Sequence, residues 1–181
     1  MSDSYQIKDQ SAIYFLTLQV VGWVDIFSRR HYRDVIINSL KFCIENKGLV
    51  CYAYVIMTNH VHIIVHSDRD ALSDTIRDFK RFTSRQIMKD VSERTDENRK
   101  EWMDIVFKYH AKFNKRSGEK QFWTHENHAV ELSDNNMKNS KLNYIHDNPV
   151  RAGWVESPEH YLYSSARDYS GIKGLLEIEM I

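Results

Sequence analysis

The sequence is poor in the residues that mark disulfide-rich, linker-rich or membrane-spanning proteins. Among 181 residues there are only two cysteines, two prolines and six glycines. Cys43 and Cys51 form no CxxC pair, which argues against a disulfide scaffold or a thiolate zinc site. The longest apolar stretch, Ala12–Val24, contains polar residues and is too short to span a membrane, and residues 1–10 lack an apolar signal-peptide core. We therefore expect a protein of the reducing cytoplasm with no membrane partner.

The chain also lacks a net charge, because 25 Lys and Arg balance 25 Asp and Glu. A net charge of zero gives no general attraction to nucleic acid. The charges are unevenly spread, however, since residues 77–120 hold 13 basic and 8 acidic side chains. This basic segment is a weak indication of nucleic-acid binding, and an exposed helical surface would explain it as well.

The spacing of apolar residues predicts an α+β fold. Continuous apolar runs over 12–21, 49–57 and 60–65 indicate strands, and a fourth short strand is expected near 129–132. Helical spacing covers 33–46, 72–91, 101–113 and a last segment from 133 to about 146, which Pro149 is expected to stop. This order predicts a ferredoxin-like antiparallel sheet with helices on one face, an inserted helical segment and a C-terminal extension.

Two histidines on the third expected strand are candidate metal ligands. His60 and His62 are two positions apart, so their side chains project from the same face of a strand. Two neutral imidazoles can chelate one divalent ion and leave positions for oxygen ligands, which suits Mg²⁺ or Mn²⁺, although Zn²⁺ is also possible. Polar residues on a solvent-facing sheet surface would produce the same pattern.

A second constellation lies on the last expected helix, where Tyr144 and Asn148 are four residues apart. On a helix these positions share a face, so a tyrosine nucleophile and an amide oxygen could both point at the sheet. The alternative is an aromatic packing residue followed by a helix cap. Pro149 also disfavours the helical conformation of Asn148, so the shared face is least secure at the proposed ligand.

Two stretches resemble the single-tyrosine HUH transposases. AYVIMTNHVHIIV, residues 53–65, resembles the HUH strand, and KLNYIHDNPVRAGWVESPEHYLYSSARDY, residues 141–169, resembles the C-terminal signature of REP-associated tyrosine transposases. The two lie about 80 residues apart, and the resemblance covers roughly residues 14–169. Thr58 stands where relatives often have proline, and the polar segment 92–100 is longer than in compact members.

The resemblance implies a mechanism. Tyr144 corresponds to the nucleophile, and the metal ligands correspond to His60, His62 and Asn148, with Mg²⁺ or Mn²⁺ as the cofactor. Family members cleave single-stranded DNA beside hairpins, form a bond between the tyrosine and a 5′ phosphate, and rejoin strands by attack of a 3′ hydroxyl. The resemblance therefore implies an endonuclease and strand-transferase that acts as a monomer or homodimer, in the cytoplasm at the nucleoid.

The domain organisation follows from this resemblance. We expect a flexible N-terminus over residues 1–11, an HUH single-tyrosine transposase domain over 12–148, and an extension over 149–181 packed on the same domain. Several basic side chains are candidate contacts for DNA phosphates. These candidates are Arg77, Lys80, Arg81, Arg85, Lys112, Lys115, Arg116 and Arg151.

Three other functions fit parts of the sequence. A histidine-triad hydrolase would need a third histidine at position 64, where the chain has Ile64. A domesticated, non-catalytic DNA-hairpin-binding protein is the main alternative, although every expected active-site position is filled. A structural zinc protein would unfold when its zinc is removed.

Overall fold

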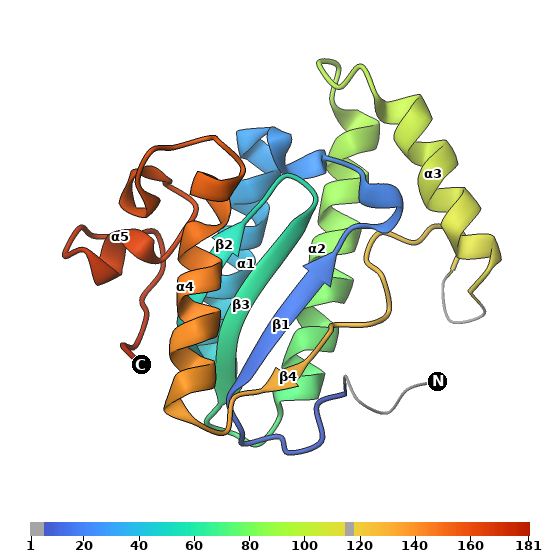
Figure 1. Cartoon of the computed structure of the whole chain (residues 1–181). Helices are drawn as coiled ribbons and strands as arrows, with labels where there is room; N and C mark the ends of the chain where they lie inside the picture. The colour runs from blue at the N-terminus through green and yellow to red at the C-terminus, as the bar shows by residue number, and fades with distance from the viewer. Residues whose placement is uncertain (1–5, 115–117) are drawn as a thin grey trace.

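The structure is a computed structural model that describes residues 6–114 and 118–181, so Lys115 and Arg116 lie outside the described residues (Figure 1). The strands and long helices are β1 (Tyr14–Gln19), α1 (Arg30–Lys47), β2 (Leu49–Ile56), β3 (His60–Ser67), α2 (Leu72–Glu93), α3 (Lys100–Lys112), β4 (Val130–Glu131) and α4 (Asn135–Arg151). The short elements are η2 (Val21–Trp23), η3 (Ile26–Ser28), η4 (Pro158–His160) and α5 (Ala166–Tyr169). Each strand and helix expected from the sequence is present.

The four strands form one antiparallel sheet in the order β2-β3-β1-β4. Because α1 connects β1 to β2 and α2 precedes β4, this order is the ferredoxin-like arrangement, and the expected α+β fold is confirmed. The register of β1 against β3 places Thr17 opposite His62 and Gln19 opposite His60. Directly paired residues share a face, so these four side chains project from the same side of the sheet.

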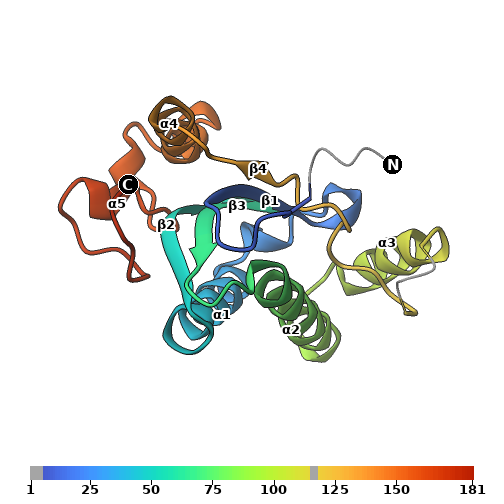
Figure 2. The same ribbon diagram turned by 90° about the horizontal axis from the view of Figure 1, so that it is seen from below.

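Helices cover both faces of this sheet (Figure 2). α1 and α2 lie together on one face, where Val61, Ile63 and Val65 of β3 are fully buried. The sequence led us to expect helices on one face; α4 in addition lies over the opposite face. The face that carries both histidines is therefore covered by the helix that carries Tyr144.

Helix α4 continues beyond the point at which the sequence predicted its end. Asp134 caps its start by accepting a hydrogen bond of 2.9 Å from the backbone nitrogen of Met137. We expected Pro149 to stop the helix, with the last turn near residue 146, but α4 includes Pro149 and ends at Arg151. A proline in the last turn removes only one backbone donor, and the burial of Pro149 adds packing that offsets this loss.

The polar segment before α3 is anchored by a buried carboxylate. Glu97 is 1% exposed and lies 3.0 Å from Arg29 Nε and 3.1 Å from Arg99 Nε. Tyr32 donates a third hydrogen bond to it, of 3.3 Å. The segment at 92–100 is therefore fixed against the start of α1.

The C-terminal extension runs along the outer edge of the sheet. Ile56 and Tyr163 share a backbone hydrogen bond of 3.0 Å, and Ser165 N donates to the carbonyl of Tyr54 at 3.0 Å. Tyr161 Oη donates to the carbonyl of Ile56 at 2.7 Å, and both Tyr161 and Tyr163 are buried. These contacts cover the free edge of β2.

Within the described residues, no helix has the length and apolar character needed to cross a membrane.

Candidate active site

The two histidines lie side by side on β3, facing α4. The ring centroids of His60 and His62 are 4.6 Å apart. His62 is 4% exposed and His60 is half-buried. Ile64, the next residue on this face, is fully buried, so the third histidine of a histidine-triad site is absent here. The strand thus presents a pair of imidazoles at its N-terminal end.

Each imidazole has its Nδ1 atom engaged by a neighbour. His60 Nδ1 lies 2.6 Å from Asn59 Oδ1, and His62 Nδ1 lies 2.9 Å from Thr17 Oγ1. Asn59 donates through Nδ2 to the carbonyl of Trp23 at 3.5 Å, which turns its amide oxygen toward His60. An amide oxygen only accepts, so His60 carries its proton on Nδ1 and its Nε2 lone pair is free. His62 Nε2 is buried and has no hydrogen-bond partner among the described residues.

Burial keeps both rings neutral. It lowers the pKa of His60, and it lowers the pKa of His62 to about 3, with smaller contributions from the nearby His60 and Lys141. A metal ligand must be the neutral imidazole, so neither ring would have to lose a proton at neutral pH before binding an ion.

Tyr144 lies directly against the histidine pair. Its ring centroid is 5.2 Å from that of His62 and 6.0 Å from that of Phe15, and its side chain is 38% exposed. Two cations flank it, since Lys141 Nζ and Arg151 Cζ each lie 5.7 Å from the ring centroid. Positive charge at this position suits a negatively charged substrate such as a DNA phosphate.

Asn148 occupies the next turn of α4 on the side of Tyr144. Its Nδ2 donates to the carbonyl of Tyr144 at 3.0 Å, which leaves the amide oxygen free to accept or to ligate. Lys141 contacts Phe15, whereas Tyr144 reaches His62, so α4 runs antiparallel to β3 (Figure 1). One helical turn beyond Tyr144 therefore leads toward His60, since a turn and two strand residues both span about 6 Å.

The donors that the fold collects here suit a hard divalent ion. Within the described residues, no three His, Cys, Asp or Glu side chains gather into a metal site. The candidate set is instead two imidazole nitrogens and the amide oxygen of Asn148. The unpartnered, buried His62 Nε2 is the feature that an ion would satisfy. Nitrogen and oxygen donors without a thiolate fit Mg²⁺ or Mn²⁺.

Several residues of this site were not anticipated from the sequence. Thr17 and Asn59 hold the histidine rings, and Lys141 lies over both Phe15 and Tyr144. Their signals were present but weak. Thr17 is a polar residue within an apolar strand, and Lys141 precedes Tyr144 by three positions on the same helix.

The proposed phosphate contacts are scattered. Lys80 anchors the loop before β4, because its Nζ lies 2.7 Å from the carbonyl oxygen of Thr124 and 2.6 Å from Asn127 Oδ1. Burial lowers its pKa to about 8. Lys80 is therefore unsuited to contact a DNA phosphate, since its ammonium group is already hydrogen-bonded within the protein. A periodic pattern of basic residues could not separate this half-buried, hydrogen-bonded cation from its exposed neighbours.

The remaining basic candidates within the described residues are exposed. Arg77 pairs with Asp74 and Asp78. Arg81 and Arg85 continue along the same helix, α2, which covers the sheet face opposite α4 (Figure 2). DNA held at Tyr144 would have to pass round the edge of the sheet to reach them. The other exposed candidates are Lys112 and Arg151, and of these only Arg151 adjoins Tyr144.

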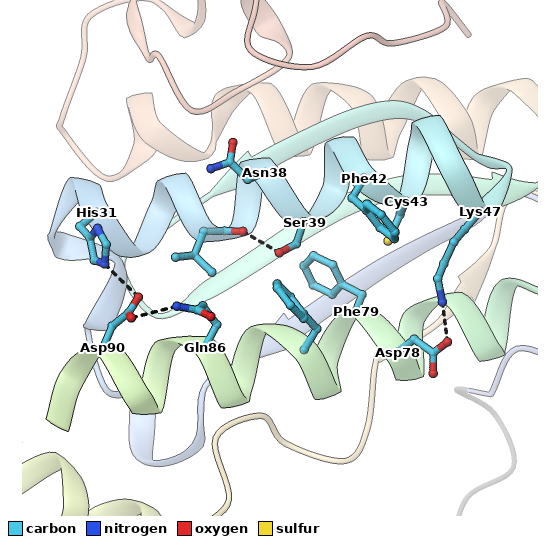
Figure 3. A pocket seen from close by; sticks show the side chains of 12 residues that line it. His31, Asn38, Ser39, Phe42, Cys43, Lys47, Asp78, Phe79, Gln86 and Asp90 are labelled. Carbon is cyan, nitrogen blue, oxygen red and sulfur yellow. Dashed lines mark hydrogen bonds and ion pairs between the residues drawn. The ribbon is translucent and has the colours of Figure 1, made fainter. Parts of the chain in front are cut away.

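A large hollow lies away from the tyrosine, between α1 and α2 (Figure 3). It measures about 710 Å³ and has an apolar floor that includes Phe79, Phe82 and Cys43. An ion pair between Lys47 and Asp78 and a hydrogen bond between His31 and Asp90 lie at its two ends. Burial raises the pKa of the Cys43 thiol to about 11, so this hollow contains no activated nucleophile of that kind.

Residues 24–108 match the family model described as "Transposase IS200 like". The resemblance to the single-tyrosine transposases is confirmed. The match to this transposase family includes the histidine strand and ends before Tyr144, so the roles on α4 rest on the geometry and on the resemblance of residues 141–169.

A solved structure supports the fold assignment. It is described as a REP-associated tyrosine transposase bound to a REP hairpin, and it is 17% identical to this chain. The superposition has a TM-score of 0.63 and covers 99% of this chain and 92% of that chain. At this identity the likeness shows the fold, including its last helix and extension. No curated protein matches the chain.

Proposed function

We propose that this chain is a metal-dependent, single-stranded DNA endonuclease and strand-transferase that cleaves beside DNA hairpins, with Tyr144 as its nucleophile. The observation that carries the proposal is the contact between the Tyr144 ring and His62, whose buried Nε2 lacks a partner. The proposed nucleophile and a proposed divalent-ion ligand thus lie in contact. The hairpin-bound relative supports a hairpin as the DNA partner.

In this mechanism the Tyr144 oxygen attacks the scissile phosphorus in line with the leaving group. A bond forms between the tyrosine and the 5′ phosphate, the bond from phosphorus to the 3′ oxygen breaks, and the leaving oxygen gains a proton. Lys141 and Arg151 lie beside the Tyr144 ring, where their positive charges attract the DNA phosphate. A bound Mg²⁺ or Mn²⁺ would polarise the phosphate. Attack of a second strand's 3′ hydroxyl on the phosphotyrosine then releases Tyr144 without ATP.

The ligands proposed for the ion are His60, His62 and Asn148. The two imidazoles are already neutral and oriented by Asn59 and Thr17, so the site is preorganised. The catalytic unit is proposed to span residues 12–148, with residues 149–181 packed against it. Since Tyr144 contacts the His62 of its own chain, a monomer contains both halves of the site.

The test uses end-labelled single-stranded DNA hairpins from the flanks of the gene, incubated with Mn²⁺ or EDTA and separated on a denaturing protein gel. We expect a covalent protein–DNA band that requires Mn²⁺ and is absent in Tyr144→Phe. Binding of the hairpin by Tyr144→Phe should be unchanged, because only the hydroxyl is removed. Cleavage by a folded Tyr144→Phe protein would contradict the proposal. Binding without cleavage across a wide hairpin pool would favour the domesticated, binding-only alternative.

A further inference from the structure

Gln19 occupies a position beside the histidine pair that the function described so far does not use. It is the last residue of β1, and its Cα partner in the sheet is His60. Side chains alternate along a strand, so Gln19 shares its face with Thr17, which holds His62. Directly opposite residues of an antiparallel pair have Cβ atoms about 5 Å apart. The side chain of Gln19 therefore starts directly beside that of His60 on the same face of the sheet.

The amide of Gln19 is unsatisfied. Its Nε2 is shielded from solvent and has no hydrogen-bond partner among the described residues, as is also true of His62 Nε2. Leaving such a donor unpaired in a shielded position is unfavourable, because the hydrogen bond to water that it loses is not replaced. The nitrogen and oxygen of a carboxamide have nearly the same shape, so the amide can be turned over without new contacts. Turned over, it puts an acceptor oxygen at this shielded position, on the sheet face that carries both imidazoles, and a cation is a group that an amide oxygen and imidazole nitrogens can bind together.

We propose that Gln19 is an additional metal ligand, which binds the ion through its side-chain oxygen together with His60 and His62. The inference rests on the proposed metal-dependent function. It adds a donor from β1 to those on β3 and α4, and an amide oxygen is a hard ligand suited to Mg²⁺ or Mn²⁺. All of these ligands are uncharged, so the ion keeps its full positive charge for the phosphate that it polarises.

Another use of Gln19 would be donation from its NH₂ group to a DNA phosphate. The structure favours the ion, because Nε2 is closed off from solvent and a phosphate could not reach it without a rearrangement. The two uses also respond differently to mutation. Gln19→Glu keeps an oxygen donor and loses the NH₂ group, whereas Gln19→Met has a similar size and loses both.

The experiment is a titration with Mn²⁺ alone, followed by electron paramagnetic resonance, on the wild type, Gln19→Met, Gln19→Glu and His62→Ala. We expect Gln19→Met to bind Mn²⁺ at least about tenfold more weakly, and Gln19→Glu to bind it as tightly as the wild type or more so. His62→Ala should lose binding. Circular dichroism and the thermal midpoint check that each variant is folded.

The outcomes separate this inference from the proposed function. Equal binding by wild type and Gln19→Met, with binding lost in His62→Ala, would overturn the role of Gln19 and leave the metal site intact. No binding by the wild type would overturn both. A loss of hairpin binding in EDTA by both Gln19 variants, with Mn²⁺ binding unchanged, would identify Gln19 as a phosphate contact instead.

Discussion

At the scale of single residues, the chemistry of the site depends on which ring nitrogen of each histidine is free. Asn59 and Thr17 engage the two Nδ1 atoms, so both Nε2 atoms are left for a ligand. Neither residue needs to touch DNA or the ion to matter. Both residues orient the rings, and the amide oxygen of Asn59, which can only accept, also fixes the tautomer of His60.

Asn59→Ala should therefore weaken the metal site without unfolding the protein. The carboxamide of Asn59 accepts the Nδ1 proton of His60, and its loss frees the ring to rotate or to change tautomer. We expect Mn²⁺ affinity to fall by about 10–100-fold. Nitrogen-15 spectra of the histidine rings would check the cause, since a purely structural role would leave the His60 tautomer unchanged.

The buried His62 makes stability depend on pH. Its folded pKa is about 3, while an unfolded histidine titrates near 6.5. Between these two pKa values the unfolded state binds more protons than the folded state. The contribution of neutral His62 to the free energy of unfolding is therefore fully present above pH 6.5 and is lost as the pH falls toward 3. The loss approaches about 1.4 kcal/mol for each pH unit within this range. Urea midpoints measured at pH 7, 5 and 4 should fall more steeply for the wild type than for His62→Asn, and parallel curves would refute this origin.

At the scale of elements, α4 brings the nucleophile to the metal ligands. The helix passes through Pro149 to Arg151, so Asn148 stays on the side of Tyr144 and its amide is held by the helix backbone.

The segment before α3 is held in place by a buried carboxylate, Glu97, and its two arginine partners. Burial by itself would raise the pKa of Glu97, but hydrogen bonds from Arg99 and the charges of Arg99 and Arg29 outweigh burial and hold it below its usual value.

Glu97→Gln should destabilise this region. The substitution keeps the size of the side chain but leaves Arg29 and Arg99 without their buried partner. Because both arginines are partly exposed, we expect a loss of about 2 kcal/mol, below the full cost of a broken buried pair. Urea denaturation measures the loss, and faster hydrogen exchange in α3 would locate it. Asp96→Asn is the matched control, since Asp96 is exposed and should change stability little.

At the scale of the whole molecule, one chain contains the complete candidate site. The sheet supplies the histidines on the face that α4 covers, and the C-terminal extension protects the outer edge of β2. The fold therefore needs no second copy to bring Tyr144 to His62.

A mixing experiment tests this arrangement. If Tyr144 acts on DNA bound by its own chain, Tyr144→Phe mixed with His62→Ala should remain inactive, because neither chain has a complete site. Denaturing gels with labelled hairpins would show the covalent product. Restored cleavage in the mixture would show that subunits exchange the tyrosine helix.

The sequence by itself determined the elements and the candidate reactive residues. Apolar periodicity is a local property, so it predicted each strand and helix, and the strand alternation placed His60 and His62 on one face. The predicted end of α4 was wrong. The rule that proline stops a helix ignores the packing of a buried proline in the last helical turn.

Only the tertiary structure decided which residues meet. Strand register pairs Thr17 with His62 and Gln19 with His60, and register depends on contacts between segments far apart in the chain. Burial likewise separated Lys80, which anchors a loop, from the exposed arginines with the same helical spacing. Local patterns fix which face a side chain takes on its own element. The partner that it meets there depends on long-range packing, which no local pattern encodes.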